Sequence, residues 1–291
     1  MQDDSSITPE AVARLRAWEG RSETLHDELT AAPVRALSAT LDRDDPEPAA
    51  GTALPPLWHW LYFLPRHLQS ELGADGHAKL GGFLPPVPLP RRMWAGGRLQ
   101  WHAPLRVGEP VRRMSRIAGV THKAGRSGDL VFVLVRHEVH NANGLAVIEE
   151  HDIVYRAAAR PGDPVVPAQA APADAPWSRE IVPDPVLLFR YSALTFNGHR
   201  IHYDRSYVTE VEGYPGLVVH GPLIATLLVD LVRRQRPEAT LRSFSFKAVR
   251  PTYDLHPFGV NGRPSGDGRG VTLWAQDHEG WLTMQAEAQL D

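Results

Sequence analysis

The stretch Val218-Val-His-Gly-Pro-Leu-Ile-Ala-Thr-Leu-Leu-Val-Asp-Leu-Val-Arg-Arg-Gln235 predicts the helix around which the fold is organised. Gly221 and Pro222 suit a helix start, and leucines recur at helical spacing after them. Arg233 and Arg234 fall where the helix dipole favours cations. A glycine at the start lets a ligand approach unpaired backbone N–H groups, although an apolar core helix with a tight first turn fits the same pattern.

A fainter copy of this helix lies near the start of the chain. Ala32-Pro-Val-Arg-Ala-Leu-Ser-Ala-Thr-Leu-Asp42 repeats the order of proline, apolar helical run and aspartate. Residues 98–111 likewise resemble residues 242–255. Alternating segments typical of strands follow each copy, at 130–139 and 146–155, and at 271–275 and 282–288. The chain therefore predicts an α+β fold in which a helix followed by antiparallel strands occurs twice.

The repeat divides the chain into two units. Residues 1–160 form the first unit and 177–291 the second, joined by a Pro-, Ala- and Asp-rich linker at 161–176. The first unit carries an insertion at about 43–97, in which residues 81–97 are expected to form a loop holding Arg91, Arg92 and Trp94. Long loops inside compact domains are usually functional or disordered. Such a loop could pair its arginines with a carboxylate or phosphate, but they could equally be solvated surface charges.

The stretch Ser192-Ala-Leu-Thr-Phe-Asn-Gly-His-Arg-Ile-His-Tyr-Asp204 concentrates chemical groups in the second unit. It follows a strand-like apolar run at 182–190 and precedes a loop, a setting that suits a functional site. Each histidine taken singly is as often a structural residue. A zinc or iron site made of His199, His202 and Asp204 is a further hypothesis. It requires helical spacing, whereas residues 201–203 look extended.

Composition limits the class of protein. The 291 residues are 43% hydrophobic and 22% charged, as in soluble globular proteins, and the net charge of −3 argues against nucleic acid as the main partner. The absence of cysteine excludes disulfides, thiolate metal sites and cysteine nucleophiles. Residues 1–7 do not resemble a signal peptide, and the longest apolar run is far shorter than the roughly 20 residues of a membrane span. We expect a cytoplasmic protein without a membrane partner. Thr8 and Pro9 predict a first helix that runs to about Trp18.

The two stretches of the second unit resemble the MaoC-type family of hotdog-fold enoyl-thioester hydratases and dehydratases. That family's signature is Gly-Asp-x-Asn-Pro-[Ile/Val/Leu]-His-x-[Asp/Glu], followed later by a His-Gly helix start. Its catalytic histidine falls on His202, its last acidic position on Asp204, and the His-Gly pair on His220 and Gly221. The resemblance implies a double hotdog, with one antiparallel sheet wrapped around a central helix in each unit.

Several positions depart from the signature. Phe196, His199 and Arg200 replace its Gly, Asn and Pro, and Asn197 replaces its catalytic Asp. An amide cannot exchange a proton as a carboxylate does, so the family mechanism cannot be copied unchanged. The whole stretch is nevertheless similar to a branch with a FAS1-like dehydratase domain. That branch contains type 2 hydroxyacyl-thioester dehydratases and mesaconyl-C4-CoA (3-methylfumaryl-CoA) hydratases. The similarity extends through residues 81–97.

The resemblance implies a hydro-lyase that acts on an enoyl-CoA. His202 is the expected base for water, Asn197 orients that water, and the Gly221 N–H holds the thioester oxygen. Asp204 fixes the tautomer of the histidine or merely caps a turn. The first unit has Ala31-Ala32 in place of His220-Gly221, so one site per chain is expected, with the first unit as one wall. The expected substrate-binding residues are Arg91, Arg92, Trp94, His199, Arg200 and His220.

The branch favours mesaconyl-C4-CoA, hydrated to citramalyl-CoA, as the substrate, with Arg91, Arg92 and Arg200 as candidates to bind its carboxylate. Itaconyl-CoA and a plain 3-hydroxyacyl thioester are alternatives. No cofactor and no metal are expected, and the acyl-CoA is the expected partner, with a possible homodimer of chains. Two other classes stay open, namely a catalytically silent acyl-CoA-binding protein and a metal-dependent hydrolase.

Overall fold

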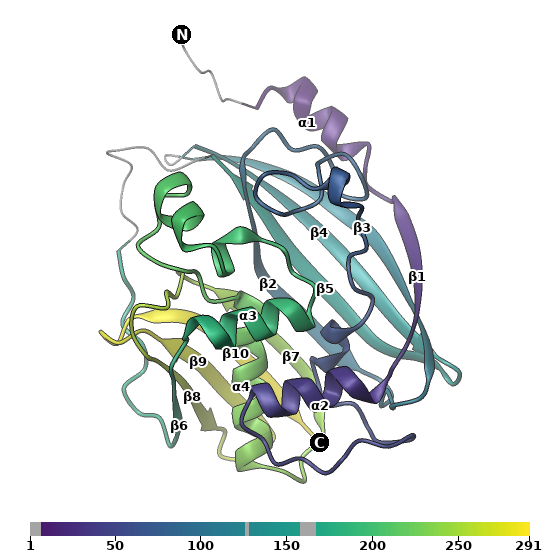
Figure 1. Ribbon diagram of the computed structural model, residues 1–291, viewed down its shortest axis with the longest axis vertical. Helices are drawn as coiled ribbons and strands as arrows, with labels where there is room; N and C mark the ends of the chain where they lie inside the picture. The colour runs from purple at the N-terminus through teal and green to yellow at the C-terminus, as the bar shows by residue number, and fades with distance from the viewer. Residues whose placement is uncertain (1–6, 126–127, 158–166) are drawn as a thin grey trace.

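A computed structural model describes residues 7–125, 128–157 and 167–291. Ten antiparallel strands form one curved sheet, with helices packed against it (Figure 1). The strand order is β1-β3-β4-β5-β2-β7-β10-β9-β8-β6, so the first five strands come from the first unit and the last five from the second. The predicted repetition of a helix followed by antiparallel strands is confirmed, and the two units share one continuous sheet.

The first unit begins with helix α1 (Pro9–Arg16), which Thr8 caps by accepting the N–H of Ala11 at 3.2 Å, as predicted. Side chains along β4 alternate between buried and half-buried positions, because one face of the strand lies on the core. The other elements of this unit are β1 (Ser22–Glu28), α2 (Ala31–Thr40), the 3₁₀ turns η1 (Trp58–Leu61) and η2 (Gln69–Glu71), β2 (Arg91–Trp101), β3 (Pro110–Gly125), β4 (Gly128–Asn141) and β5 (Gly144–Arg156).

The second unit repeats this order with an added helix. Of the predicted linker, residues 161–166 lie outside the described residues, and Ala170 forms an isolated bridge with Trp281. The elements that follow are β6 (Trp177–Ile181), α3 (Pro185–Leu194), the 3₁₀ turn η3 (Arg200–His202), the π-helical turn η4 (Tyr207–Val211), α4 (Gly221–Gln235), β7 (Leu241–Ala248), β8 (Phe258–Pro264), β9 (Gly270–Gln276) and β10 (Leu282–Leu290).

Three local predictions are wrong. Residues 185–190, predicted as part of a strand-like run, lie in helix α3, because Asp184 accepts the N–H of Leu187 at 2.9 Å and Pro185 suits a first helical position. Residues 91–97, predicted as loop, belong to β2 because they pair with β5. Of residues 201–203, predicted as extended, the first two lie in a 3₁₀ turn at 200–202 and Tyr203 ends it.

The two units join where β2 pairs with β7. Gly96 faces Lys247 and Gly97 faces Phe246 across this seam. A Cβ atom on Gly96 would lie 2.6 Å from the carbonyl oxygen of Phe246, and one on Gly97 would lie 2.9 Å from its ring. Only glycine therefore lets β7 approach this closely, and the seam fixes how the two halves face each other.

Helix α4 forms the middle of the core. Every residue from Leu223 to Val232 is buried, because the helix packs on β8, β9 and β10 while α2 and α3 pack together in front of the sheet (Figure 1). The one acid in this buried run, Asp230, is fully covered and forms ion pairs with Arg43, Arg179 and Arg234 at 2.8, 3.0 and 2.7 Å. Among the described residues, no helix has both the length and the apolar content needed to cross a membrane.

Candidate active site

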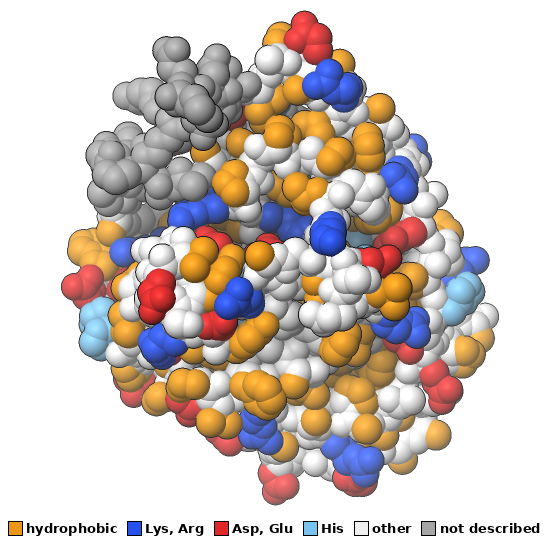
Figure 2. Space-filling model, turned by 45° about the horizontal axis from the view of Figure 1, so that its top comes forward, with side chains coloured by type: hydrophobic (Ala, Val, Ile, Leu, Met, Phe, Trp, Pro, Cys, Tyr) orange, Lys and Arg blue, Asp and Glu red, His pale blue; other side chains and the backbone are white. Residues whose placement is uncertain are grey.

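A cavity of about 1660 Å³ is lined by both units. The first unit contributes the insertion and the inner faces of β2 to β5. The second contributes α3, the segment that continues to Tyr203, the start of α4 and β10. Figure 2 shows Lys and Arg side chains along a recess that crosses the middle of one face of the molecule. All predicted site residues except Asp204 and His220 line this one cavity, so the insertion lies in the same site as the motif.

His202 is the best-defined chemical group in this cavity. Its side chain is buried, and Nδ1 lies 2.7 Å from the carbonyl oxygen of Val218. A carbonyl only accepts hydrogen bonds, so Nδ1 carries the proton and Nε2 keeps its lone pair. Burial lowers the pKa of His202 to about 4, against the effects of the Val218 hydrogen bond. The ring is therefore neutral at pH 7 and able to accept a proton.

His220 supports His202 from behind. The two rings stack with centroids 3.8 Å apart and 17° between their planes. Nε2 of His220 lies 2.8 Å from the hydroxyl oxygen of Ser192, on α3, and burial holds the pKa of His220 well below its usual range. The predicted substrate-binding role of His220 stays a prediction, and its observed contacts are with His202 and Ser192.

The start of α4 leaves room for a ligand at Gly221. A Cβ atom there would meet nothing closer than 4.0 Å, at Met284 and the carbonyl oxygen of Trp94. Gly221 lines the cavity, and none of the hydrogen bonds among the described residues uses its N–H. Pro222 follows and has no N–H of its own. The arrangement suits an oxygen that carries negative charge at the helix N-terminus.

Asn197 and Asp204 mainly stabilise the turn that carries the histidines. The side-chain oxygen of Asn197 accepts the N–H of His199 at 3.0 Å. Asp204 accepts bonds from Arg200 and from the backbone N–H of Tyr207, at 2.7 and 3.0 Å. Of the two roles predicted for Asp204, the turn cap is the one its contacts match, because Val218 and not Asp204 bonds Nδ1 of His202.

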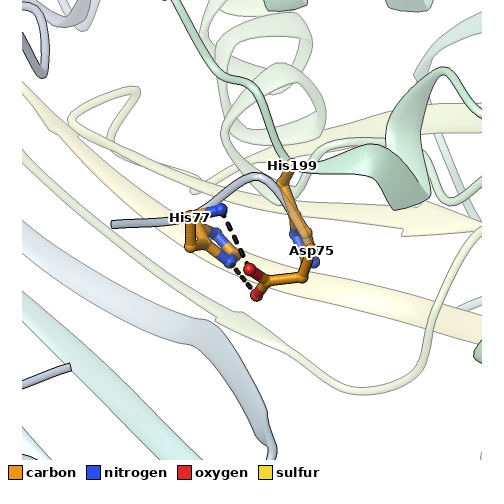
Figure 3. Close-up of side chains that lie close together, drawn as sticks. All are labelled: Asp75, His77 and His199. Carbon is orange, nitrogen blue, oxygen red and sulfur yellow. Dashed lines mark hydrogen bonds and ion pairs between the residues drawn. The ribbon is translucent and has the colours of Figure 1, made fainter. Parts of the chain in front are cut away.

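Asp75 and His77 are site residues that the sequence did not reveal. They lie in the insertion, and Figure 3 shows them against His199. Oδ2 of Asp75 is 2.8 Å from Nδ1 of His77, and the His77 ring lies 3.9 Å from the ring of His199. Burial lowers the pKa of His77, and it lowers that of His199 to about 2. Burial alone would raise the pKa of Asp75, but the hydrogen bond from His77 holds it below its usual value.

These three side chains also form the one group within the described residues that could hold a metal ion. Their ligand atoms lie within 4.8 Å of one another. The group differs from the predicted alternative of His199, His202 and Asp204, because Asp204 bonds Arg200. Imidazole and carboxylate ligands of this kind suit zinc or iron. Nδ1 of His77 already bonds Asp75, so a metal would have to use Nε2.

A close backbone approach brings the insertion to the motif. The carbonyl oxygens of Ala74 and Asp75 accept the Nη1 and the backbone N–H of Arg200, at 3.0 and 2.9 Å. A Cβ atom on Gly76, whose φ is +86°, would lie 1.8 Å from the carbonyl oxygen of Gly198. Glycine is therefore required at both the contact and the turn. The Gly73-Ala-Asp-Gly-His77 stretch signals a turn in the sequence, but it does not show which segment the turn contacts.

The predicted arginines line the cavity and differ in their partners. The Nη2 of Arg91 donates to the carbonyl oxygen of Glu212 at 2.7 Å, and its guanidinium lies 5.0 Å over the ring of Tyr214. Arg200 pairs with Asp204 at 2.7 Å. Arg92 lines the cavity without an ion pair among the described residues.

Trp94 lies beside the first unit's histidines. Its ring is 3.9 Å from that of His151, and its Nε1 donates to the carbonyl oxygen of Gly96 at 2.8 Å. Trp94 lines the same cavity as His202. It therefore forms part of the wall contributed by the first unit, as predicted from the sequence.

Two antiparallel units fused into one sheet, with a neutral histidine and an open helix start facing a shared cavity, define a double-hotdog protein of the MaoC-like class. Solved structures support this fold. A MaoC-like dehydratase has a TM-score of 0.69 at 13% identity, covering 94% of this chain and 98% of that one. A Mycobacterium tuberculosis protein described as having a double hotdog fold has a TM-score of 0.56 at 14% identity, covering 94% and 96%.

The chain belongs to the hydroxyacyl-thioester dehydratase type 2 family, whose model matches residues 57–254. It is also similar to the mesaconyl-C(4)-CoA hydratase of Chloroflexus aurantiacus. The two are 49% identical over 277 residues, which cover 94% of this chain and 97% of that protein. The family match spans most of the insertion, both strands of the seam and the motif, and it confirms the resemblance on which the sequence predictions depend.

Proposed function

We propose that the protein is a hydro-lyase that adds water across the double bond of mesaconyl-C4-CoA to give citramalyl-CoA. The observation that carries this proposal is His202, a buried neutral histidine whose free Nε2 belongs to a ring in the cavity wall. The likeness to the C. aurantiacus hydratase supports the choice of substrate. Membership of the dehydratase family supports the reaction class.

The reaction requires a base for water and a place for negative charge. Nε2 of His202 takes a proton from water as the water oxygen bonds to the β-carbon. The electron pair of the double bond moves toward the thioester carbonyl, whose oxygen is held by the Gly221 N–H at the positive end of α4. His202 then returns the proton to the α-carbon. Water is consumed and the enzyme is unchanged.

The pair of Asp75 and His77 supplies a second group for the water. Asp75 holds the proton of His77 on Nδ1, so Nε2 of His77 is an acceptor like that of His202. The signature's carboxylate is absent at Asn197, whose oxygen already bonds the His199 N–H. We assign His77 to orient the water, Asp75 to position His77, and the Asn197 amide group to assist.

Substrate anions and the cellular setting complete the proposal. An acyl-CoA carries phosphates as well as the carboxylate, and Arg91, Arg92 and Arg200 are candidates for these charges. Addition of water moves no electrons to or from a cofactor, so none is required. The cytoplasm is the proposed location and a homodimer the proposed assembly.

The first test is an assay of the purified protein with four thioesters, namely mesaconyl-C4-CoA, itaconyl-CoA, crotonyl-CoA and a 3-hydroxyacyl-CoA. Absorbance follows the double bond, and mass spectrometry follows a change of one water. Reversible hydration that chelator does not affect is the expected result, with mesaconyl-C4-CoA turned over best. Tight binding without turnover would instead indicate a silent acyl-CoA-binding protein, and loss of activity in chelator would indicate a metal at Asp75, His77 and His199.

A further inference from the structure

Two buried nitrogen atoms in the cavity wall of the first unit have no hydrogen-bond partner within the described part of the chain. They are Nε of Arg113, on β3, and Nε2 of His137, on β4. Both residues line the cavity, and His137 is only 7% exposed. Buried polar groups are nearly always paired, so two unpaired groups in one wall of a cavity are candidates to bind a ligand.

The register of the sheet places both side chains on one face. Ser115 lies opposite His137, and Arg113 lies two residues before Ser115, so it points the same way. The hydroxyl of Ser115 is 2.8 Å from Nδ1 of His137. When that hydroxyl donates to Nδ1, Nε2 carries the proton. Both unpaired nitrogens are then donors on the same face of the sheet, an arrangement that suits a ligand with acceptor oxygens.

The nearby acids do not occupy these donors. Glu149 accepts hydrogen bonds from His59 at 2.8 Å, Trp60 at 2.7 Å and His151. No carboxylate of the described chain forms an ion pair with Arg113, although the charges of Glu149, Glu23 and Asp27 act on it. Its guanidinium lies 5.1 Å over the ring of Phe63, which covers one face. A half-buried cation without an ion pair favours an anionic ligand.

A short series of contacts connects this wall to the proposed reaction centre. A Cβ atom on Gly221 would lie 4.0 Å from the carbonyl oxygen of Trp94. The Trp94 ring is 3.9 Å from that of His151, which is 4.4 Å from the ring of His137. His137 is thus connected to Trp94 through the ring of His151, and the carbonyl oxygen of Trp94 lies beside the helix start at Gly221.

We propose that Arg113 and His137 bind the free carboxylate of the substrate and thereby select enoyl-CoA thioesters that carry one. The inference rests on the proposed function and names its specificity site. In mesaconyl-C4-CoA the carboxylate is attached to the β-carbon. The negative charge of this carboxylate would oppose the attack of water on that carbon. Pairing it with a guanidinium removes that opposition as well as anchoring the acyl group. Arg91, Arg92 and Arg200 are then left for other anionic groups.

The test compares mesaconyl-C4-CoA with 3-methylcrotonyl-CoA, which has a methyl group in place of the carboxylate. Arg113→Gln should lower kcat/KM for mesaconyl-C4-CoA by a factor on the order of 10². It should change kcat/KM for 3-methylcrotonyl-CoA by less than about threefold. Arg113→Lys, which keeps the charge but loses Nε, should fall between. Arg112→Gln is the matched control, because Arg112 is the exposed neighbour on the opposite face of β3.

Equal losses on both thioesters would overturn the inference, since they would show that Arg113 only supports the fold. The inference would also be overturned if Arg92→Gln, but not Arg113→Gln, abolished the preference for mesaconyl-C4-CoA over 3-methylcrotonyl-CoA. That result would place the carboxylate at Arg92. If the wild-type protein hydrates neither thioester, the proposed function fails instead. Calorimetric binding then decides the inference alone, because Arg113→Gln should weaken binding of mesaconyl-C4-CoA and spare that of 3-methylcrotonyl-CoA.

Discussion

Nδ1 of His202 donates to the carbonyl oxygen of Val218 at 2.7 Å, and this bond leaves Nε2 as the basic atom. His202→Ala should therefore lower kcat by a factor on the order of 10² or more without unfolding the protein. Steady-state kinetics with mesaconyl-C4-CoA measures the loss. His278→Ala, at an exposed position of the second unit, is the control and should leave kcat unchanged. Full turnover by His202→Ala would remove His202 as the base.

Activity and stability should respond differently to acid. Burial lowers the pKa of His202 to about 4, so its base form persists far below the usual pKa of about 6.5. Initial-rate kcat/KM should stay level from pH 8 to about 5 and fall only toward pH 4. An acid limb near pH 6.5 would contradict this assignment.

The lowered pKa values of the buried histidines preserve activity in acid, but they make the folded protein less stable there. Below about pH 6.5 the unfolded chain binds protons that the buried His77, His199, His202 and His220 do not bind when folded. The free energy of unfolding is therefore highest above that pH and declines as pH falls toward 4. Calorimetric melting midpoints between pH 8 and 4.5 should show this decline, and a rising midpoint would contradict it.

Asp75 and His77 should behave as one functional unit. Asp75→Asn and His77→Gln should each lower kcat by about tenfold or more, and the double variant should lose little beyond either single change. The backbone carbonyl of Asp75 still accepts the N–H of Arg200 in these variants, so the contact between insertion and motif remains. Additive losses in the double-mutant cycle would show that the two residues act independently.

Gly221→Ala should reduce activity without reducing the stability of the fold. The added methyl group meets no protein atom closer than 4.0 Å, so the melting midpoint should hold or rise slightly. Activity should nevertheless fall by about tenfold or more, because the methyl group occupies space beside the N–H proposed to hold the thioester oxygen. Gly97→Ala is the comparison, and should destabilise the fold because its Cβ would lie 2.9 Å from the Phe246 ring. Unchanged kinetics in Gly221→Ala would show that the thioester oxygen does not lie beside the Gly221 N–H.

Asp230 should contribute to stability and not to catalysis. Its fully buried carboxylate pairs with three arginines at 3.0 Å or less and with Arg233 at 4.0 Å. Asp230→Ala removes the buried anion from this group of cations and should lower the free energy of unfolding by about 3–5 kcal/mol. Urea denaturation measures this difference. Arg35→Ala breaks an exposed pair with Glu47 and should cost less than about 1 kcal/mol. A similarly small effect of Asp230→Ala would show that the arginines find other partners.

The parts of the fold that were predictable are those with local signals. The α4 segment shows helical spacing and a Gly-Pro start, and β4, β5, β9 and β10 show alternation, so both halves could be outlined from sequence. Helix α3 was misassigned because a short apolar run fits a strand or a helix equally well. The Asp184-Pro185 pair, which is a helix-start signal, was the information that could have decided it.

His202, the proposed base, could be located by its motif, but its surroundings could not. The pairing of His202 with Val218 depends on a turn between residues 16 apart. The contact of Asp75 and His77 with His199 depends on two segments more than 120 residues apart, and no local pattern encodes it. The unpaired donors of Arg113 and His137 become visible only when burial and partners are known.

The β2–β7 seam described above has a consequence for redesign. Proton transfer is assigned mainly to side chains beyond the seam, in residues 192–221, and recognition of the acyl group to β3 and β4 on the other side. A library confined to the inner faces of β3 to β5 could therefore change which acid is accepted while leaving the machinery for water addition untouched. The two halves of the sheet thus separate the residues that can be varied for substrate choice from those assigned to proton transfer.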